Sequence, residues 1–378
     1  MTSDELAVSL HAKYKGKITT SLRDADELTR EKLSAYYSPG VGEISRRIAS
    51  DETKLKDFTW TNNLVAVISD GSAVLGLGNI GAKAAMPVME GKALLFKHFA
   101  GIDSVPIVLD VHTADEIVEV VKAIAPSFGA INLEDIAAPI CFEVEERLKA
   151  ELNIPIMHDD QHGTAVVTLA GLINACKVTG RQLSHCKIVV VGAGAAGVAI
   201  ARLLDTYAHP EIIAVDSQGI ISPARSDLNE AKQLLLQFTN HDHVRGTMAE
   251  ALADADIFIG VSQAGLLTPD MIKTMAKDQI IFALANPTPE IMPDIARGAG
   301  AAVVATGRSD FPNQVNNAVA FPGIFRGALD NGVNRITDEH KIAAAEAIAS
   351  LVTTPTSEEI IPSVFTPELV PKIAAVIK

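Results

Sequence analysis

The sequence contains no long apolar run. Nowhere do about 18 apolar residues follow one another, which is the length that a membrane-spanning helix needs. The first 17 residues also lack the uninterrupted apolar segment that a secretory signal peptide carries. These two absences predict a cytoplasmic protein that makes no contact with a membrane.

Cysteines, aromatic residues and clusters of basic residues are also scarce. No two of the three cysteines form a C-x-x-C pair, so we expect buried, reduced thiols rather than disulfides or a thiolate metal site. Aromatic residues make up only 4% of the chain, so aliphatic side chains must fill most of the core. With a net charge of −14 and no dense Lys/Arg cluster, the sequence argues against a nucleic-acid partner.

What the sequence does contain is an alternation of strand-like and helix-like segments. Residues 1–60 look mostly helical and polar, with a break at Ser38-Pro39-Gly40. From residue 64 onward, short runs rich in β-branched residues alternate with helical stretches, and this alternation predicts an α/β fold with parallel sheets. The expected strands lie at 64–69, 106–111, 130–135, 154–160, 187–194, 211–216, 256–262, 279–287 and 301–307.

The chain length indicates how these segments are organised. A chain of 378 residues is too long for one ordinary core, so two domains are expected. We predict an N-terminal α/β domain with a parallel sheet over residues 1–160 and a Rossmann-type dinucleotide-binding domain over residues 161–317. Helices within 318–378 are expected to return to the first domain.

A glycine-rich turn in the second block predicts a dinucleotide site. The pattern G-x-G-x-x-G follows a strand-like run and opens a helix-like one, which is the context that a βαβ unit requires. Its glycines permit a tight turn, close approach of the pyrophosphate and close packing of helix on strand, and the helix N-terminus offers N–H groups to the phosphates. The turn comprises Gly192, Gly194, Ala195, Ala196 and Gly197.

Asp216 decides which dinucleotide the sequence favours. It closes the next predicted strand, 19 residues after Gly197. A carboxylate there can accept hydrogen bonds from both ribose hydroxyls of NAD and would repel the 2′-phosphate of NADP. The nearest basic residue is Arg225, so the sequence favours NAD and leaves NADP open.

Two acidic pairs follow predicted strands of the first domain. Glu134-Asp135 and Asp159-Asp160 should both lie at the carboxyl edge of the sheet, where open α/β sheets bind ligands. Carboxylate oxygens suit Mg²⁺ or Mn²⁺, and the lack of a Cys or His cluster argues against zinc. By spacing alone, the same residues also fit helix caps and turns.

Two further residues have side chains suited to proton transfer. Lys92 lies in the apolar segment PVMEGKALLF, where burial would lower the pKa of the ammonium and make it a general base. Tyr37 directly precedes the turn at residues 38–40, which can present a phenol. Taken alone, each also fits a structural role, Lys92 at the surface and Tyr37 in the core.

Several motifs in combination resemble those of the malic enzyme family, in its short bacterial form. The resemblance spans nearly the whole chain. The motifs are YSPGVGEI (37–44), SDGSAVLGLGNIG (69–81), MEGKALLF (89–96), NLEDI (132–136), HDDQHGTA (158–165), VGAGAAG (191–197), LANPTPE (284–290) and QVNNAVAFPG (314–323).

This resemblance implies roles for the matching residues. Tyr37 would be the general acid and Lys92 the general base, with Asp159 holding the lysine in place. Glu134, Asp135 and Asp160 would bind the metal, and Asn286 and Asn317 would contact substrate and nicotinamide. Longer members carry an arginine that anchors a malate carboxylate, whereas the matching segment here has Ser72 and Ala73. The amides of residues 76–81, Asn286 and Asn317 are the candidates to replace that arginine.

The expected activity is the oxidative decarboxylation of L-malate to pyruvate and CO₂ with reduction of NAD or NADP. A malolactic enzyme and an oxaloacetate decarboxylase share the same motifs and stay open as alternatives. A nucleotide sensor without catalysis would need only residues 187–216 and would leave Lys92, Tyr37 and both acidic pairs unexplained. The family resemblance also implies a homodimer, with the N-terminal helices as a candidate interface.

Overall fold

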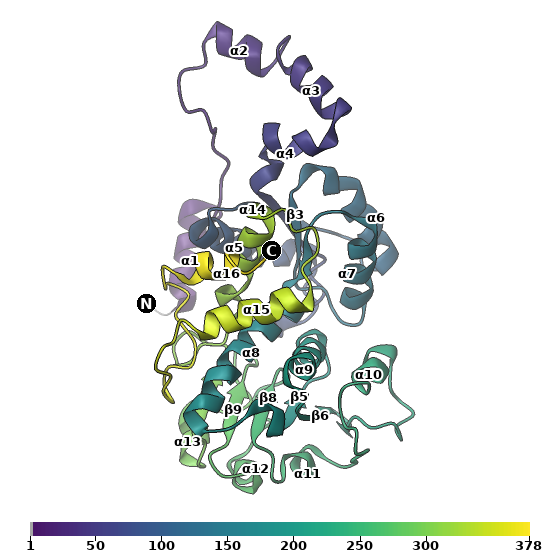
Figure 1. The fold of residues 1–378 in the computed structure, drawn as a ribbon, viewed down its shortest axis with the longest axis vertical. Coiled ribbons are helices and arrows are strands. Elements are labelled where there is room, and N and C mark those ends of the chain that lie inside the picture. The colour runs from purple at the N-terminus through teal and green to yellow at the C-terminus, as the bar shows by residue number, and fades with distance from the viewer. Residues whose placement is uncertain (1–2) are drawn as a thin grey trace.

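The computed structural model describes residues 3–378, which form two sheets covered by helices and a projecting arm (Figure 1). The N-terminal sheet has the order β2-β1-β3-β4, and all its strands are parallel. Its strands are β1 (Leu64–Ser69), β2 (Asp103–Val108), β3 (Ala130–Leu133) and β4 (Ile156–His158). β2 begins at Asp103, three residues before the expected position, so Pro106 lies inside the strand. An edge strand tolerates a proline, which lacks an N–H for the sheet.

The C-terminal sheet has the order β10-β9-β8-β5-β6-β7. Only β7 runs antiparallel, and this two-residue strand was not predicted. The others confirm the predicted α/β architecture. The strands are β5 (Lys187–Val191), β6 (Glu211–Asp216), β7 (Gly219–Ile220), β8 (Ile257–Gly260), β9 (Ile280–Ala283) and β10 (Val303–Thr306).

Each sheet has one point where successive connections leave in opposite directions. In the N-terminal sheet this point lies between β1 and β3, and in the C-terminal sheet it lies between β5 and β8. Ligands of open α/β sheets bind outside the carboxyl ends of the strands at such points. The acidic residues after β3 and the glycine-rich turn after β5 both lie at one.

The helix α8 (Asp159–Thr179) joins the two sheets through the middle of the molecule. Most of its residues are buried, as is typical of a helix surrounded by protein on all sides. It begins at Asp159, so Asp159 and Asp160, which the expected strand at 154–160 included, instead form its first turn. Its side chains share one core cluster with residues of both sheets.

The remaining helices cover the faces of the sheets. C-terminal residues pack beside the N-terminal sheet, where Phe321 and Phe325 of α14 contact Phe96 of α5 with ring centroids 4.7 and 5.3 Å apart. Among the described residues, no helix combines the length and apolarity needed to cross a membrane. The helices are α1 (Ser3–Tyr14), α5 (Ala82–Ala100), α6 (Ala114–Ile124), α7 (Ile140–Glu151), α9 (Ala195–Ala208), α10 (Glu230–Leu235), α11 (Met248–Leu252), α12 (Pro269–Thr274), α13 (Pro293–Gly298), α14 (Phe321–Asp330), α15 (Asp338–Ala349) and α16 (Leu369–Ala374).

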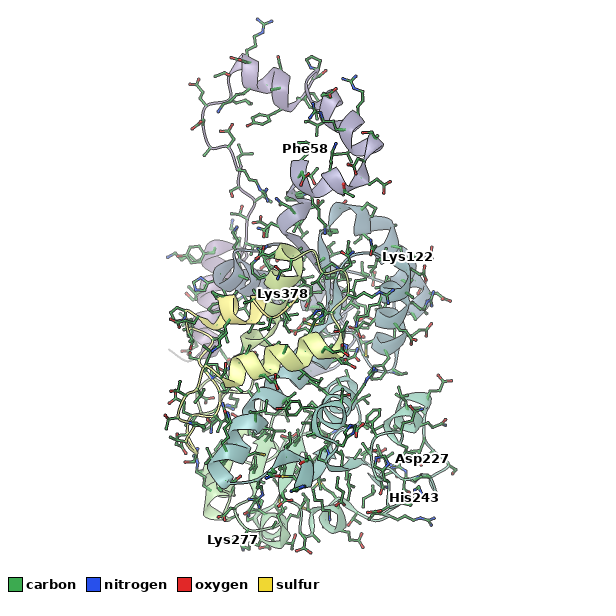
Figure 2. All side chains as sticks on the ribbon, in the orientation of Figure 1. Phe58, Lys122, Asp227, His243, Lys277 and Lys378 are labelled. Atoms are coloured by element: carbon green, nitrogen blue, oxygen red, sulfur yellow. The ribbon has the colours of Figure 1, made fainter. Side chains whose placement is uncertain are left out.

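An arm of residues 24–60 projects from the body, with α2 (Arg30–Tyr36) and α3 (Val41–Ser50) farthest out and α4 (Leu55–Phe58) at its base (Figure 1). None of these three helices has a buried residue. Figure 2 shows Phe58 near the base of the arm, and this side chain is 42% exposed. The arm therefore contributes almost nothing to the core of its own chain.

Candidate active site

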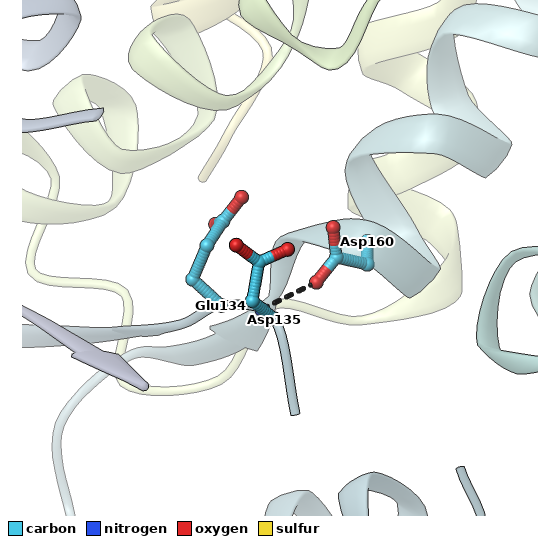
Figure 3. A group of neighbouring side chains, drawn as sticks. All are labelled: Glu134, Asp135 and Asp160. Carbon is cyan, nitrogen blue, oxygen red and sulfur yellow. Dashed lines mark hydrogen bonds between the residues drawn. The ribbon is translucent and has the colours of Figure 1, made fainter. Parts of the chain in front are cut away.

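Three carboxylates come together at the carboxyl edge of the N-terminal sheet (Figure 3). Glu134 and Asp135 follow β3, and Asp160 lies in the first turn of α8. One oxygen from each lies within 4.8 Å of the others. Asp160 Oδ2 also accepts a hydrogen bond from the backbone N–H of Asp135 at 2.8 Å. The end of β3 and the start of α8 are thereby tied together around the group.

Lys92 reaches this group from α5. Its Nζ lies 2.6 Å from Asp159 Oδ2 and 2.8 Å from Glu134 Oε1. The ammonium also lies over the ring of Phe321, 4.3 Å from the ring centroid. The second oxygen of Asp159, Oδ1, is buried and has no hydrogen-bond partner among the described residues. The site thus holds one ammonium among four carboxylates, of which Glu134, Asp135 and Asp159 are buried and Asp160 is half-buried.

The charge state of Lys92 differs from the one predicted. Burial alone would lower the pKa of its ammonium, but the negative charges of Asp159 and Glu134 outweigh burial and raise that pKa above its ordinary value. The prediction of a lowered pKa is therefore wrong for the chain alone. It failed because the sequence segment around Lys92 is apolar, whereas its partners in space are charged.

The carboxylates themselves carry more negative charge than one lysine can offset. Burial raises the pKa of Asp159 and of Asp160 to about 6, against the opposing effect of Lys92. Burial likewise raises the pKa of Glu134. A divalent cation would remove this repulsion, and three converging carboxylates are the oxygen ligands that Mg²⁺ and Mn²⁺ prefer. The residues therefore fit such an ion, with Glu134, Asp135 and Asp160 as its ligands.

Replacing Asp160 by asparagine tests this fit. Asparagine can still accept the hydrogen bond from Asp135 N–H, so the turn should persist while one negative ligand is lost. We expect Mn²⁺ to bind at least about a hundredfold more weakly, because even outer partners of metal ligands contribute ten- to hundredfold. Free Mn²⁺ measured by electron paramagnetic resonance gives the dissociation constant. Asp110→Asn is the matched control, because Asp110 also follows a strand but is exposed; equal affinity in both variants would contradict the assignment.

Two supporting residues were not identified from the sequence. Buried Asn132 donates from Nδ2 to Glu134 Oε2 at 2.8 Å. Glu145 of α7 accepts a hydrogen bond from the backbone N–H of His158 at 2.8 Å and lies 2.7 Å from Nε2 of His162. Asn132 could have been found, because residues two apart on a strand share a face. Glu145 could not, because its partners lie on other elements.

The glycine-rich turn has the geometry that a dinucleotide requires. Gly192 has φ of 116°, and a side chain there would meet the carbonyl oxygen of Val261. Gly197 has no room for a side chain against the carbonyl oxygen of Gly192. Gly194, in contrast, faces open space, with nothing within 4 Å of the position of a Cβ. Two glycines thus serve packing and one leaves room for a pyrophosphate at the N-terminus of α9.

The carboxyl edges of the two sheets face each other. Gly76, in the loop after β1, has no room for a side chain against the carbonyl oxygen of Asn286, which follows β9. A Cβ at Gly163 would lie 3.0 Å from Cβ of Asn317 and would overlap Asp159 Oδ1. Asn317 therefore lies beside the Lys92–Asp159 pair, and Asn286 lies across from the loop after β1.

Asp216 ends β6 as predicted, but it is not a free acceptor. Its two carboxylate oxygens already accept hydrogen bonds from Arg225, Lys232 and the backbone N–H of Gln218. These donors outweigh burial and hold the pKa of Asp216 at about 2. Arg225 was noted in the sequence as the nearest basic residue, whereas Lys232 was not.

Tyr37 lies apart from the other candidate residues. It caps α2 in the arm, and its side chain is 71% exposed. The structure thus brings together Lys92, Asp159 and the three carboxylates, places Asn317 beside them, and leaves Tyr37 on the arm. Among the described residues, no tyrosine hydroxyl is found in contact with the Lys92 ammonium.

Comparison with known proteins gives matches over nearly the whole chain. The family model of the malic enzyme N-terminal domain matches residues 15–149, and that of the malic enzyme NAD binding domain matches residues 161–376. A bifunctional malic/malolactic enzyme from Bacillus subtilis is 54% identical over 377 residues, which cover 99% of this chain and 92% of the relative.

Two further relatives carry different cofactor names. An NADP-dependent malic enzyme from Halomonas elongata is 45% identical over 361 residues, which cover 94% of this chain and 84% of the relative. The crystal structure of an NAD-dependent malic enzyme from Thermotoga maritima has a TM-score of 0.95 at 48% identity and covers 98% of both chains. The similarity therefore includes both the sheets and the facing edges between them.

Proposed function

The chain belongs to the malic enzyme family, and we propose that it converts L-malate to pyruvate and CO₂ with reduction of a nicotinamide dinucleotide, NAD being preferred. The observation that carries this proposal is the position of Lys92. Its Nζ lies within 2.8 Å of two carboxylates, at a sheet edge that meets Asn286 and Asn317 of the dinucleotide-binding half. That arrangement supports the proposal that a base, an anionic cation-binding group and a hydride acceptor site lie next to one another.

The proposed chemistry assigns one proton transfer to each of two residues. Lys92, once neutral, takes the proton of the C2 hydroxyl of malate, and Asp159 stabilises the resulting ammonium. NAD bound at the glycine-rich turn would supply the acceptor for the hydride of C2, and loss of that hydride converts malate to oxaloacetate. A divalent cation held by Glu134, Asp135 and Asp160 would polarise the C2 oxygen and stabilise the enolate left by loss of CO₂. Tyr37 then gives a proton to C3 and yields pyruvate.

The loop after β1 is proposed to anchor a carboxylate of malate in place of the arginine of longer members. Within this loop, the N–H groups of Leu77, Ile80 and Gly81 already donate to carbonyls of the same loop. This leaves the N–H groups of Gly76, Gly78 and Asn79 as candidates among residues 76–81. Asn286 and Asn317 are the side-chain candidates, because both lie at the facing edges.

A product assay tests the activity and separates its alternatives. The purified protein is incubated with L-malate and Mn²⁺, with NAD or with NADP, and absorbance of the reduced cofactor is followed while the product is identified. We expect pyruvate in a one-to-one ratio with reduced cofactor, and loss of activity on chelation. Lactate without net reduced cofactor would indicate a malolactic enzyme, for which the name of the Bacillus relative is the supporting observation. Activity on oxaloacetate alone would indicate a decarboxylase.

We further propose a homodimer in which each arm serves the site of the other chain. The arm exposes Leu28, Leu33, Tyr36, Tyr37 and Trp60, each at least 48% exposed. Helices of the length of α2 and α3 are marginal in water unless they pack on something, and grouped exposed apolar residues usually mark an interface. A second copy is the proposed occupant, because the arm exposes Tyr37 while no tyrosine of the described part of the chain contacts Lys92. Exchange of arms about a two-fold axis would satisfy both chains at once.

A further inference from the structure

The carboxylate of Asp216 has no acceptor site left for a ribose. Oδ1 accepts hydrogen bonds from Arg225 Nη1 and from the backbone N–H of Gln218, both at 2.8 Å. Oδ2 accepts them from Arg225 Nη2 at 2.9 Å and from Lys232 Nζ at 2.7 Å. A carboxylate offers about four lone-pair sites, so a ribose hydroxyl can bind only by displacing one of these donors.

The two cations around Asp216 are not held equally. Arg225 also forms a two-pronged pair with Asp227, at 2.9 and 2.5 Å, and so lies fixed between two carboxylates. Figure 2 shows Asp227 at the outer edge of the dinucleotide-binding half. Lys232 pairs, among the described residues, with Asp216 alone. Lys232 is therefore the donor that can leave at least cost.

The charge of this cluster also differs from that of a lone aspartate. Two carboxylates, Asp216 and Asp227, are balanced by Arg225 and Lys232. The end of β6 is the place where Rossmann domains bind the adenosine ribose and distinguish NAD from NADP. A neutral cluster with a releasable ammonium does not repel a phosphate there, as a lone Asp216 would.

From this arrangement we infer that Lys232 is the specificity-determining residue that lets the enzyme accept NADP in addition to NAD. Lys232 leaves Asp216 and binds the 2′-phosphate of NADP, while Arg225 stays in place and offsets the charge of Asp216. With NAD, one ribose hydroxyl takes the place that Lys232 leaves on Oδ2. The inference rests on the proposed dinucleotide-dependent function and adds the chemical basis of its cofactor range.

Binding of two small probes to the purified full chain tests this role without catalysis. 5′-AMP contains the adenosine end without a 2′-phosphate, and 2′,5′-ADP adds that phosphate. Calorimetric titration of Lys232→Ala should show 2′,5′-ADP binding at least about tenfold more weakly than to the unaltered chain, which is the worth of one charge-assisted hydrogen bond. Its affinity for 5′-AMP should not fall, since no phosphate contact is lost and no ammonium has to leave Asp216 Oδ2 before the ribose binds. Lys273→Ala is the matched control, because Lys273 is an exposed lysine paired with Asp270 on α12.

The reverse change should have the reverse effect. Asp216→Asn removes the charge but keeps the shape, so Lys232 loses its carboxylate partner and becomes available to a phosphate while Asp227 still holds Arg225, and 2′,5′-ADP should bind at least about tenfold more tightly. In steady-state assays, the ratio of kcat/KM for NADP to that for NAD should fall in Lys232→Ala and rise in Asp216→Asn.

Three results would overturn the inference. An unchanged ratio of the two probe affinities in Lys232→Ala would show that Lys232 does not contact the phosphate. Failure of the unaltered chain to bind 2′,5′-ADP while it binds 5′-AMP would show that the 2′-phosphate is rejected. Failure to bind either probe would contradict the proposal that this half of the chain binds a dinucleotide. If both probes bind as expected but malate is not oxidised, the proposed reaction fails and the inference about Lys232 stands.

Discussion

Replacing Lys92 by alanine is expected to lower kcat for malate oxidation by about a thousandfold, which is the usual contribution of a general base. The reason is its position, 2.6 Å from Asp159 and 2.8 Å from Glu134, where all three side chains are buried. The dissociation constant of NADH should change less than about twofold, because Lys92 lies on α5 and the dinucleotide turn lies at residues 192–197, on a separate element. Steady-state kinetics at saturating Mn²⁺ and fluorescence titration with NADH measure the two quantities.

The alanine variant leaves Asp159 and Glu134 without their buried cation, so a second variant must separate chemistry from stability. Lys92→Arg keeps a positive charge beside both carboxylates, but a guanidinium stays protonated and cannot act as a base. It should be as inactive as the alanine variant. Lys97→Ala is the matched control on the same helix, because Lys97 is 61% exposed and pairs with Asp103 at the surface. Near-normal turnover in Lys92→Arg would refute the assignment of Lys92 as the base.

Much of the fold could be predicted from local patterns. The strands expected at 64–69 and 211–216 coincide with β1 and β6. Local patterns failed where pairing with a neighbouring strand determines the position of a strand. Pro106 lies inside β2 because that strand is at the edge, and β7 exists only because the chain turns back beside β6.

The candidate site was predictable in its acidic half and not in its charge balance. Glu134, Asp135 and Asp160 could be placed together because parallel strands bring their carboxyl ends to one edge. The sequence does not indicate which cation pairs with which anion when the two are far apart in the chain. Lys92 and Asp159, for example, are in contact but lie 67 residues apart in the sequence. For the same reason the pKa of Lys92 was predicted with the wrong sign, and Lys232 was not identified. Long-range ion pairs follow from packing, which no local window contains.

Mixing two inactive variants is expected to restore activity. Tyr37→Phe lacks the proposed acid, and Lys92→Ala lacks the base. If the arm of one chain serves the other, a mixed dimer has one site with both defects and one site with neither. Random pairing of equal amounts gives half mixed dimers, so the mixture should reach about one quarter of the activity of the unaltered protein. Each variant alone should stay inactive.

Co-expression of the two variants with different affinity tags, followed by purification over both, isolates the mixed dimer and should raise this value to about one half. If Tyr37 instead served its own chain, every site in the mixed dimer would carry one defect, and no activity would return. Tyr36→Phe is the matched control for loss of a phenol on the arm, because the Tyr36 hydroxyl donates to Asp24 within the same arm. It should keep its activity alone. Absence of restored activity in a purified mixed dimer would exclude exchange of the arms and would require the arm to fold back onto its own chain.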